Sequence, residues 1–531
     1  MSIRARHYTW IIAVFLLSSL VFSRVYKGTV TLYDYGDDDQ YWAFSHSLIY
    51  QGNLDFAHES LRLFRESPQK IVWLSPFPGL LWSPAVLLGK GLSPVVSRLP
   101  GVNQEEVHAG TSAYQRLLVS AFSACLTLGG LLFLYATLAF FLKEDSALAG
   151  TLLLFLSTPI LYYTFRRPLM AHSAELFSLA LFAYCSLRFS RQKTRFSALM
   201  TGTTGAVAVG VRYPNIFMVG SWFLMLLSMN ESKTVVRRDT AMFVLIGGFF
   251  PVLAQLFIWK ATLGTWTNHN GAYSFEPAHL TAQLAVSGNT LRTIAQFCLG
   301  KGWGLVWMET PIILAAWMTI RGGFPHARSL RILFLTGVLP LIILTANNPY
   351  SMGACYGHRY LLAKGLWTAF GLGLFYEVYG KSRWAKALPF ALCVFPLLAY
   401  LLFESGPETL TLHREEGWGN SQFAVQVLWT LLHDPKQLCF ALTGNPVAHV
   451  LLWIFSKTIG LAFLPPAVRL KVTTRLEAIS LPALLWYLGW IWTLSLSVWG
   501  ALLYFSNRHR NILSVQWDLP ESQRRAAALT L

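Results

Sequence analysis

Long apolar runs recur along this chain and limit what it can fold into. Each run has about 18 to 25 residues, enough to cross the hydrocarbon core of a bilayer as an α-helix. The composition agrees, because 54% of the residues are hydrophobic and only 13% are charged, unlike a soluble domain. The sequence therefore predicts an all-α polytopic membrane protein. The expected spans are 8–25, 114–142, 146–164, 169–189, a weak pair at 197–211 and 214–229, 240–261, 303–320, 330–348, 360–378, 384–403, 446–468 and 480–505.

The distribution of Lys and Arg predicts the orientation, because short cytoplasmic loops are enriched in these residues. With Arg4 and Arg6 in the cytoplasm, the other basic loops alternate correctly only if the weak pair counts as two spans. The net charge of +17 is then mostly a topology signal, with attraction to anionic membrane lipids as a secondary effect. The basic residues are dispersed over loops, which argues against a nucleic-acid partner.

The orientation of the C-terminal tail is inconsistent with the span count. Thirteen spans would place the tail outside, whereas its four arginines, from Arg508 to Arg525, favour the cytoplasm. Either one span is miscounted or the tail breaks the rule. We expect residues 1–403 to form one transmembrane module, 404–505 to add an outer loop and the C-terminal membrane helices, and 506–531 to form the tail.

Three non-cytoplasmic stretches, 26–113, 262–302 and 404–445, are longer than a simple connection needs, and such loops usually carry function. Within the first, residues 72–92 are apolar and contain Trp, but three prolines interrupt them. Proline removes backbone donors and kinks helices. The segment therefore predicts a re-entrant or interfacial helix, and a Pro-kinked span is the alternative.

The acidic triplet Asp37-Asp38-Asp39, just before Tyr41 in the first outer loop, is the strongest functional signal in the chain. Three adjacent carboxylates repel one another, which raises the pKa of at least one unless a cation or donor compensates. Near a lipid surface, one carboxylate can act as general base toward a hydroxyl while another binds a metal or fixes the loop. The alternative is a solvated acidic turn, since Asp favours helix N-termini.

Basic groups on the predicted outer side are the second signal, because the orientation rule disfavours them there. They include Arg166, Arg212, and the neighbouring pair His358 and Arg359. Ionisable groups near the membrane interior are functional candidates, and Arg can bind a phosphate through two hydrogen bonds. Such a cluster opposite the acidic triplet suits a reaction with a phosphate leaving group. Snorkelling of the side chain to lipid head groups is the alternative, above all for Arg167 and Lys260.

His172 lies about one turn into a predicted span, where it could hydrogen-bond a phosphate or a carboxylate. A satisfied core histidine is an equal alternative. Glu175 is its expected local partner, because residues three apart share one face of a helix. Glu309, an isolated acid near the outer face, fits a structural hydrogen-bond acceptor.

Five short elements follow one another over residues 1 to about 400. They are DDDQY at 37–41, PFPGLLWSPAVLLG at 76–89, LMAHSAELFSLALFAY at 169–184, GKGWGLVWMETP at 300–311 and YGHRY at 356–360. In order and rough spacing they resemble the GT-C superfamily of integral-membrane glycosyltransferases, specifically the family 39-like enzymes that use polyprenyl-phosphate sugars. The chain departs from that pattern at Asp38, where Glu is common, at the extra Asp39, and in a C-terminal region too short for a large soluble domain.

The resemblance implies a GT-C-like bundle of about 12 to 13 transmembrane helices, with extracytoplasmic loops that carry short interfacial helices. It implies that Asp37 is the general base and Asp38 a supporting acid, which in some relatives helps to bind a divalent cation such as Mg or Mn. Residues 1–403 would then be the catalytic module. The lipid phosphate would be held by Arg359, His358, Arg166, Arg212 and His172, with Asp39, Tyr41 and Tyr360 in support.

The implied reaction is inverting transfer of a sugar from a polyprenyl-phosphate donor to a hydroxyl of a lipid, glycan or protein acceptor. We expect this reaction on the periplasmic face of a bacterial inner membrane, because the loops lack long insertions, and an endoplasmic reticulum membrane is the alternative. An O-antigen-type ligase or polymerase is one alternative, but it would not need the early acidic motif. A transporter of lipid-linked sugars is another, but it would favour polar residues at the bilayer midplane and internal repeats. A non-catalytic scaffold leaves the acidic triplet unexplained.

Overall fold

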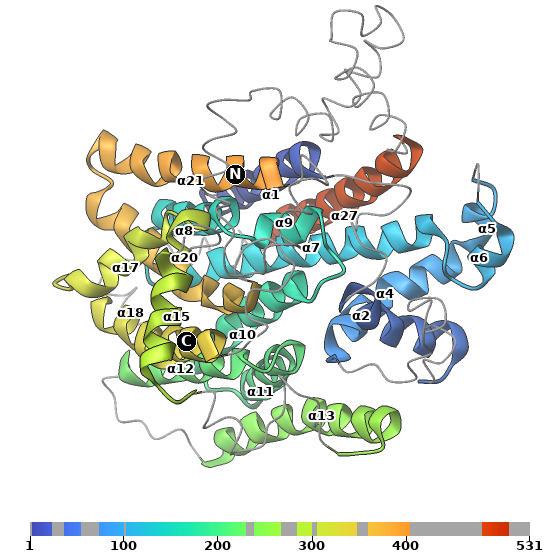
Figure 1. Ribbon diagram of the computed structural model, residues 1–531, viewed down its shortest axis with the longest axis horizontal. Coiled ribbons are helices and arrows are strands. Elements are labelled where there is room, and N and C mark those ends of the chain that lie inside the picture. Colours follow the sequence, from blue (N-terminus) through green and yellow to red (C-terminus); the bar gives the residue numbers. More distant parts are fainter. Residues whose placement is uncertain are drawn as a thin grey trace, which may run out of the picture.

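The structure, a computed structural model, describes residues 3–23, 37–54, 74–99, 102–229, 238–266, 284–299, 305–347, 359–403 and 481–508. Within these ranges every regular element is a helix, which confirms the predicted all-α class for this part of the chain (Figure 1). The helices are α1 (Ile3–Phe22), α2 (Asp37–His46), η1 (Ser47–Gln51), α4 (Phe77–Gly91), α5 (Ser93–Val96), α6 (Gln104–His108), α7 (Ala113–Leu138), α8 (Glu144–Ser157), α9 (Ile160–Phe165), α10 (His172–Gln192), α11 (Arg195–Val211), α12 (Asn215–Met229), α13 (Arg238–Leu263), α15 (Gly288–Leu299), α16 (Leu305–Met308), α17 (Ile312–Arg321), α18 (Ala327–Leu333), η3 (Phe334–Val338), α19 (Leu339–Asn347), η4 (Arg359–Lys364), α20 (Gly365–Tyr379), α21 (Arg383–Phe403) and α27 (Leu481–Arg508).

Several of the described helices are suited to a bilayer, where every backbone polar group must be satisfied within the protein. Four helical segments are long and apolar enough to cross a membrane. Two shorter apolar helices, α12 and α17, accompany them. These features agree with a polytopic membrane protein. The four segments are Ile3–Phe22, Gln104–Leu138, Ala241–Thr262 and Ala327–Asn347.

Contacts between α1 and α8 define the two ends of the bundle. Arg4 Nε lies 2.6 Å from Glu144 Oε1 where both helices begin. Farther along, the rings of Phe15 and Phe155 stack with 6.0 Å between their centroids. The two helices are therefore parallel. We call the end with Arg4 the N-terminal end, and the opposite end, which Phe22 reaches, the distal end.

The basic loops that the structure describes lie at the N-terminal end. Helix α7 ends there, because Tyr135 in its last turns hydrogen-bonds His7 of α1 at 2.9 Å. Just beyond α7, the ring of Phe140 lies 4.4 Å from the guanidinium of Arg191, at the end of α10. This arrangement agrees with the orientation predicted from Lys and Arg, which assigned these loops to one side of the membrane.

Helix α27 returns the chain to the N-terminal end. Near its start, the indole N–H of Trp486 donates to the carbonyl of Tyr114, where α7 begins at the distal end (3.1 Å). Thirteen residues on, Trp499 donates to Thr9 of α1 (3.0 Å). The chain therefore leaves α27 at the same end at which α1 begins. Of the two span counts, twelve agrees with this geometry. The predicted span 446–468 and the tail beyond Arg508 lie outside the described residues, so the predicted domain boundaries stay predictions.

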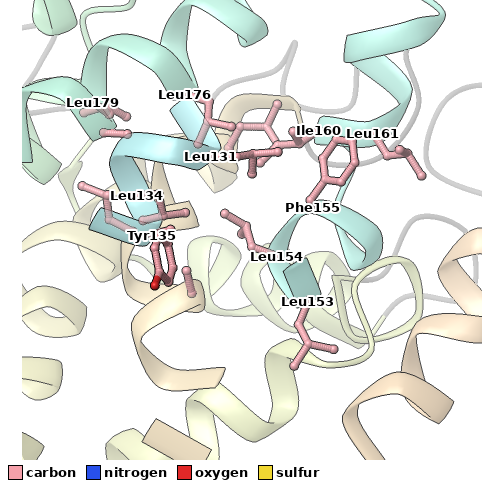
Figure 2. Close-up of a cluster of buried hydrophobic side chains, with 14 of the residues drawn as sticks. Leu131, Leu134, Tyr135, Leu153, Leu154, Phe155, Ile160, Leu161, Leu176 and Leu179 are labelled. Atoms are coloured by element: carbon pink, nitrogen blue, oxygen red, sulfur yellow. The ribbon is translucent and has the colours of Figure 1, made fainter. Parts of the chain in front are cut away.

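Helices α7, α8, α9 and α10 share a core of interlocking apolar side chains (Figure 2). Leu131 of α7 lies among Leu154 and Phe155 of α8 and Leu176 of α10, and all four are buried. Because lipid tails are as apolar as Leu, close packing rather than removal from water holds membrane helices together. This core fixes the positions at which α9 and α10 present their polar residues.

Glycines allow α11 and α13 to approach closely. A Cβ on Gly202 of α11 would overlap the backbone carbonyl of Val244, and one on Gly247 of α13 would overlap the carbonyl of Leu199. Small residues at helix interfaces permit such backbone contact in membranes. The other side of α13 exposes large apolar side chains, as expected of a lipid-facing helix. They are Met242, Leu245, Ile246, Phe249, Phe250, Val252 and Phe257.

Short helices from the first outer loop cover the distal end (Figure 1). Helix α4 has 15 residues, about 22 Å at 1.5 Å each, and is not among the segments able to cross a membrane. It packs on α2 so closely that Gly79 lies against the carbonyl of Tyr41. At its far end, Gln115 of α7 donates to the carbonyl of Gly89 at 3.3 Å. The structure agrees with the predicted interfacial helix, not with a kinked span.

Candidate active site

The acidic triplet begins helix α2 at the distal end. Asp38 is only 1% exposed, and both of its carboxylate oxygens accept hydrogen bonds from Arg167. Nη2 lies 2.8 Å from Oδ1, and Nε lies 3.2 Å from Oδ2. This paired geometry fixes the orientation of both groups. Asp37 and Asp39 belong to the same helix, but their side chains lie outside the described residues.

Arg166 and Arg167 occupy the turn between α9 and α10, where Pro168 prevents the helix from continuing. Arg166 Nε donates to the hydroxyl of Tyr400 in α21 at 3.2 Å. That hydroxyl donates to the carbonyl of Phe22, at the end of α1 (3.4 Å). Both arginines are buried. The alternative of snorkelling to lipid head groups is therefore wrong for Arg167, because its guanidinium points into the protein.

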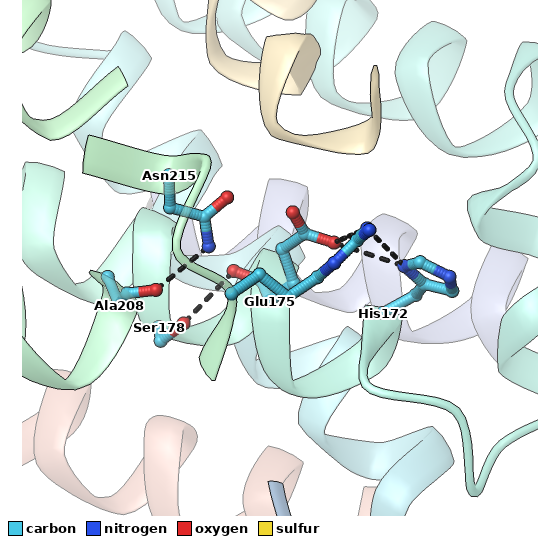
Figure 3. A network of polar contacts seen from close by, with 6 residues as sticks. His172, Glu175, Ser178, Ala208 and Asn215 are labelled. Atoms are coloured by element: carbon cyan, nitrogen blue, oxygen red, sulfur yellow. Dashed lines mark hydrogen bonds and ion pairs between the residues drawn. The ribbon is translucent and has the colours of Figure 1, made fainter. Parts of the chain in front are cut away.

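A second buried network joins α10 to the end of α11. His172 Nδ1 lies 3.0 Å from Glu175 Oε2, which confirms the predicted pairing at helical spacing. Figure 3 shows these two side chains facing each other from one helix. Arg212 Nη1 lies 3.1 Å from the same carboxylate oxygen and 3.3 Å from His172 Nδ1. One ring nitrogen serves as donor or acceptor but not both, so Nδ1 either donates to Glu175 or accepts from Arg212.

The local backbone explains why Arg212 reaches α10. Helix α11 ends at Val211, and Arg212 has an extended backbone (φ −151°, ψ 123°) that departs from the helical path. Asn215 closes the turn by donating to the carbonyl of Ala208 at 2.8 Å (Figure 3). On the α10 side, Ser178 donates to the carbonyl of Glu175 at 3.1 Å. These contacts hold the arginine over the carboxylate.

A third buried ion pair joins Glu309 to Lys364, which ends η4. Nζ lies 2.8 Å from Oε1, and the two side chains are 2% and 1% exposed. Sequence reasoning named Glu309 as a structural acceptor but did not single out Lys364. The sequence did offer a signal for Lys364. It falls inside the predicted span 360–378, and a charged residue inside a span is a candidate functional residue.

The remaining predicted site residues are distributed around these networks. Tyr41 is buried and packs edge-on against Trp82, with 6.4 Å between ring centroids, so it joins α2 to α4. Arg359 and Tyr360 begin η4, which lies against α10, α19 and α20, but their side chains lie outside the described residues, as does the whole of His358.

The described residues do not contain a metal-binding cluster. No group of three or more His, Cys, Asp or Glu side chains converges among them, and both oxygens of Asp38 already accept from Arg167. The described partners of Asp38 therefore do not fit a metal ligand set, and metal binding at Asp38 stays a prediction.

Helix α9 connects the two arginine-rich networks. The ring of Tyr163 lies 4.1 Å from that of His172, and the ring of Tyr162 lies 5.5 Å from that of Tyr400, the partner of Arg166. Among the side chains that the structure describes around α9, the distal end thus gathers three buried guanidinium groups and two buried carboxylates, from Arg166, Arg167, Arg212, Asp38 and Glu175. The three guanidinium groups are hydrogen-bond donors that suit an anionic ligand, and the acidic helix α2 lies beside them.

Comparisons with known proteins give one distant similarity. No family model matches the chain, and no curated protein matches its sequence. Among solved structures, ArnT from Cupriavidus metallidurans in the apo state is similar to it, with 14% sequence identity and a TM-score of 0.42. The match covers 91% of this chain and 75% of that protein. A similarity this distant carries no weight for function, so the function is argued from the residues of this chain.

Proposed function

We propose that this protein is a GT-C-type glycosyltransferase. It moves a sugar from a polyprenyl-phosphate donor to a hydroxyl of a lipid, glycan or protein acceptor, with inversion at the anomeric carbon. The observation that carries the proposal is the junction of Asp38 and Arg167, which brings the acidic helix α2 to the turn that also carries Arg166. The five ordered sequence elements support it.

The placement of these groups supports a reaction at the distal end, on the extracytoplasmic side. The basic loops lie at the N-terminal end, and such loops favour the cytoplasm. The distal end would then face the periplasm of a bacterial inner membrane. A lipid-linked sugar presents its phosphate and sugar at the membrane surface, where α2 and α4 cover the bundle.

In the proposed mechanism, Asp37 takes the proton of the acceptor hydroxyl. The hydroxyl oxygen forms a bond to the anomeric carbon, and the bond from that carbon to the phosphate oxygen breaks. The polyprenyl phosphate leaves with the bonding electrons. Arg359 and His358 bind this phosphate directly, and Arg166 adds positive potential. Fixed cations at developing negative charge are usually the largest contribution to such catalysis.

Asp38 and Arg212 have different roles in this mechanism. Asp38 holds α2 in place through Arg167, so that the neighbouring carboxylates have a fixed position. Arg212 and His172 are engaged with Glu175, so they contribute to phosphate binding through the charge of the network.

The proposal is tested with purified protein in lipid nanodiscs and a panel of radiolabelled polyprenyl-phosphate sugars. We expect the wild type to release polyprenyl phosphate and Asp37→Asn to lose turnover by about 10²- to 10⁴-fold, the range for a general base. Donor binding should persist in this variant. Glu105→Gln, which changes an exposed acid of the same outer loop, is the matched control and should retain full turnover.

Two other results would change the assignment. Full turnover by Asp37→Asn would move the base to Asp38 or Asp39. Absence of turnover together with movement of the lipid-linked sugar across vesicle membranes would replace the enzyme with a transporter.

A further inference from the structure

Helix α13 buries two polar side chains on the face that packs against the protein. Gln255 and Trp259 are 5% and 6% exposed, and a spacing of four residues places them on one side of the helix. Among the residues that the structure describes, neither the amide nitrogen nor the amide oxygen of Gln255 has a hydrogen-bond partner, and neither does the indole nitrogen of Trp259. Three neighbouring polar atoms are therefore buried and unsatisfied.

These atoms lie beside the candidate active site. The ring of Trp259 packs against that of Tyr213, with 5.7 Å between centroids, and Tyr213 directly follows Arg212. One position before Trp259 on α13, Ile258 packs with Ala43 and Phe44 of α2. The unsatisfied atoms thus belong to the helix surface that meets both the acidic helix and the end of α11.

A purely structural role does not explain this choice of residues. Burying a polar atom without a partner is costly, and the side of α13 that faces lipid is built from large apolar residues such as Phe249 and Phe250. An apolar residue at position 255 would pack without that cost. Buried polar atoms that lack partners in the protein are expected to bind a water molecule or a ligand.

The combination of donors and acceptor indicates the ligand. The Gln255 amide offers both, and the Trp259 indole offers a donor. A phosphate would accept from the two donors but would leave the amide oxygen unpaired. An acyl chain would leave all three atoms unpaired. A hydroxyl group both donates and accepts, so neighbouring hydroxyls of a sugar match the set, and aromatic rings supply apolar faces for its C–H groups.

We propose that Gln255 and Trp259 form a subsite for the hydroxyl groups of the sugar carried by the donor lipid. This inference rests on the proposed function, because it takes the ligand to be a polyprenyl-phosphate sugar. It adds two residues that select the sugar and do not contact the phosphate. The predicted signature is a loss of affinity that depends on the presence of the sugar.

The test is equilibrium binding of radiolabelled decaprenyl-phosphate-glucose, -mannose and -arabinose, and of sugar-free decaprenyl phosphate, to full-length protein in nanodiscs. Gln255→Leu and Trp259→Phe remove the polar atoms but retain most of the volume. We expect each to weaken binding of the preferred sugar lipid by about three- to tenfold, the effect of one or two hydrogen bonds, and to leave binding of sugar-free lipid unchanged. Because an unsatisfied group is removed, Gln255→Leu should be at least as stable as the wild type.

Trp492→Phe is the matched control. Its indole nitrogen is also buried without a partner among the described residues, but it belongs to α27, and we expect no change in binding. Equal affinity of wild type and both α13 variants for the sugar lipids would overturn the subsite and indicate a buried water, while the proposed function would stand. The subsite would also be overturned if the α13 variants bound sugar-free decaprenyl phosphate as much more weakly than the wild type as they bind the sugar lipids. Failure of the wild type to bind any of these lipids would overturn the subsite together with the proposed function.

Discussion

The guanidinium of Arg167 donates to both carboxylate oxygens of Asp38, a residue 129 positions away in the chain. This pair joins the start of α2, in the first outer loop, to the turn between α9 and α10 in the bundle. It therefore connects the acidic segment to the basic segment of the candidate active site. Both partners are buried, so breaking the pair would leave an uncompensated charge inside the protein.

We expect Arg167→Met to lower the free energy of unfolding by about 3 to 5 kcal/mol, because it leaves the buried Asp38 charge without its partner. Unfolding of the purified protein by titration with SDS measures the change. Arg188→Met, at an exposed position of α10, should have little effect. Similar losses for the two variants would contradict the importance of the buried pair.

For the buried Glu309–Lys364 pair, removing one partner should cost more stability than removing both. Lys364→Met alone leaves a buried carboxylate and should destabilise the protein by about 3 to 5 kcal/mol. The double variant Glu309→Leu/Lys364→Met removes both charges and should recover most of that loss, because apolar replacements of buried pairs are often neutral. The two residues do not interact if the stability loss of the double variant equals the sum of the losses of Lys364→Met and Glu309→Leu measured separately.

The close approach of α11 and α13 predicts opposite effects for two Gly→Ala substitutions. Gly202→Ala places a Cβ against the carbonyl of Val244, so the helices must separate and the melting temperature should fall. Gly220→Ala, in the interior of α12, meets open space and should stabilise the helix by up to about 1 kcal/mol. Thermal unfolding in detergent compares the two. An increase in stability for Gly202→Ala would argue against the tight contact.

The direction of α27 predicts that both chain termini lie on one side of the membrane. Trp499 of α27 bonds to Thr9 of α1 at 3.0 Å, which places the end of α27 near the start of the chain. Topology reporters fused in turn to the N-terminus and to residue 531 should both report the cytoplasm. Reporters on opposite sides would support thirteen spans instead, and would contradict the course of α27.

Contacts between residues close in sequence could be predicted, whereas the distant pairs could not. His172 and Glu175 share a helix face, so their contact followed from the 3.6-residue period. Asp38 and Arg167 lie in different outer segments, and snorkelling explained Arg167 equally well before its burial was known. Lys364 and Glu309 are also far apart, and nothing in their local sequences specifies a partner.

The burial of the polar atoms of α13 could not be predicted from the sequence either. The sequence marks α13 as apolar and membrane-spanning, and the helix is long and apolar enough to cross a membrane. It does not show which side of α13 meets the protein, because Gln255 and Trp259 stand among apolar residues on all sides. The glycines that dock α13 on α11 decide this, and they also decide that the polar atoms are buried.

The sequence by itself determined that the chain is a helical membrane protein, which loops share one side, and which segments are rich in acidic and basic groups. These properties follow from local composition, because a bilayer selects long apolar helices and charge bias orients them. Only the tertiary structure decided which acid meets which base, and that α27 ends beside α1. Those outcomes depend on how helices distant in sequence pack together, and packing depends on side-chain shape and close contact over the whole bundle.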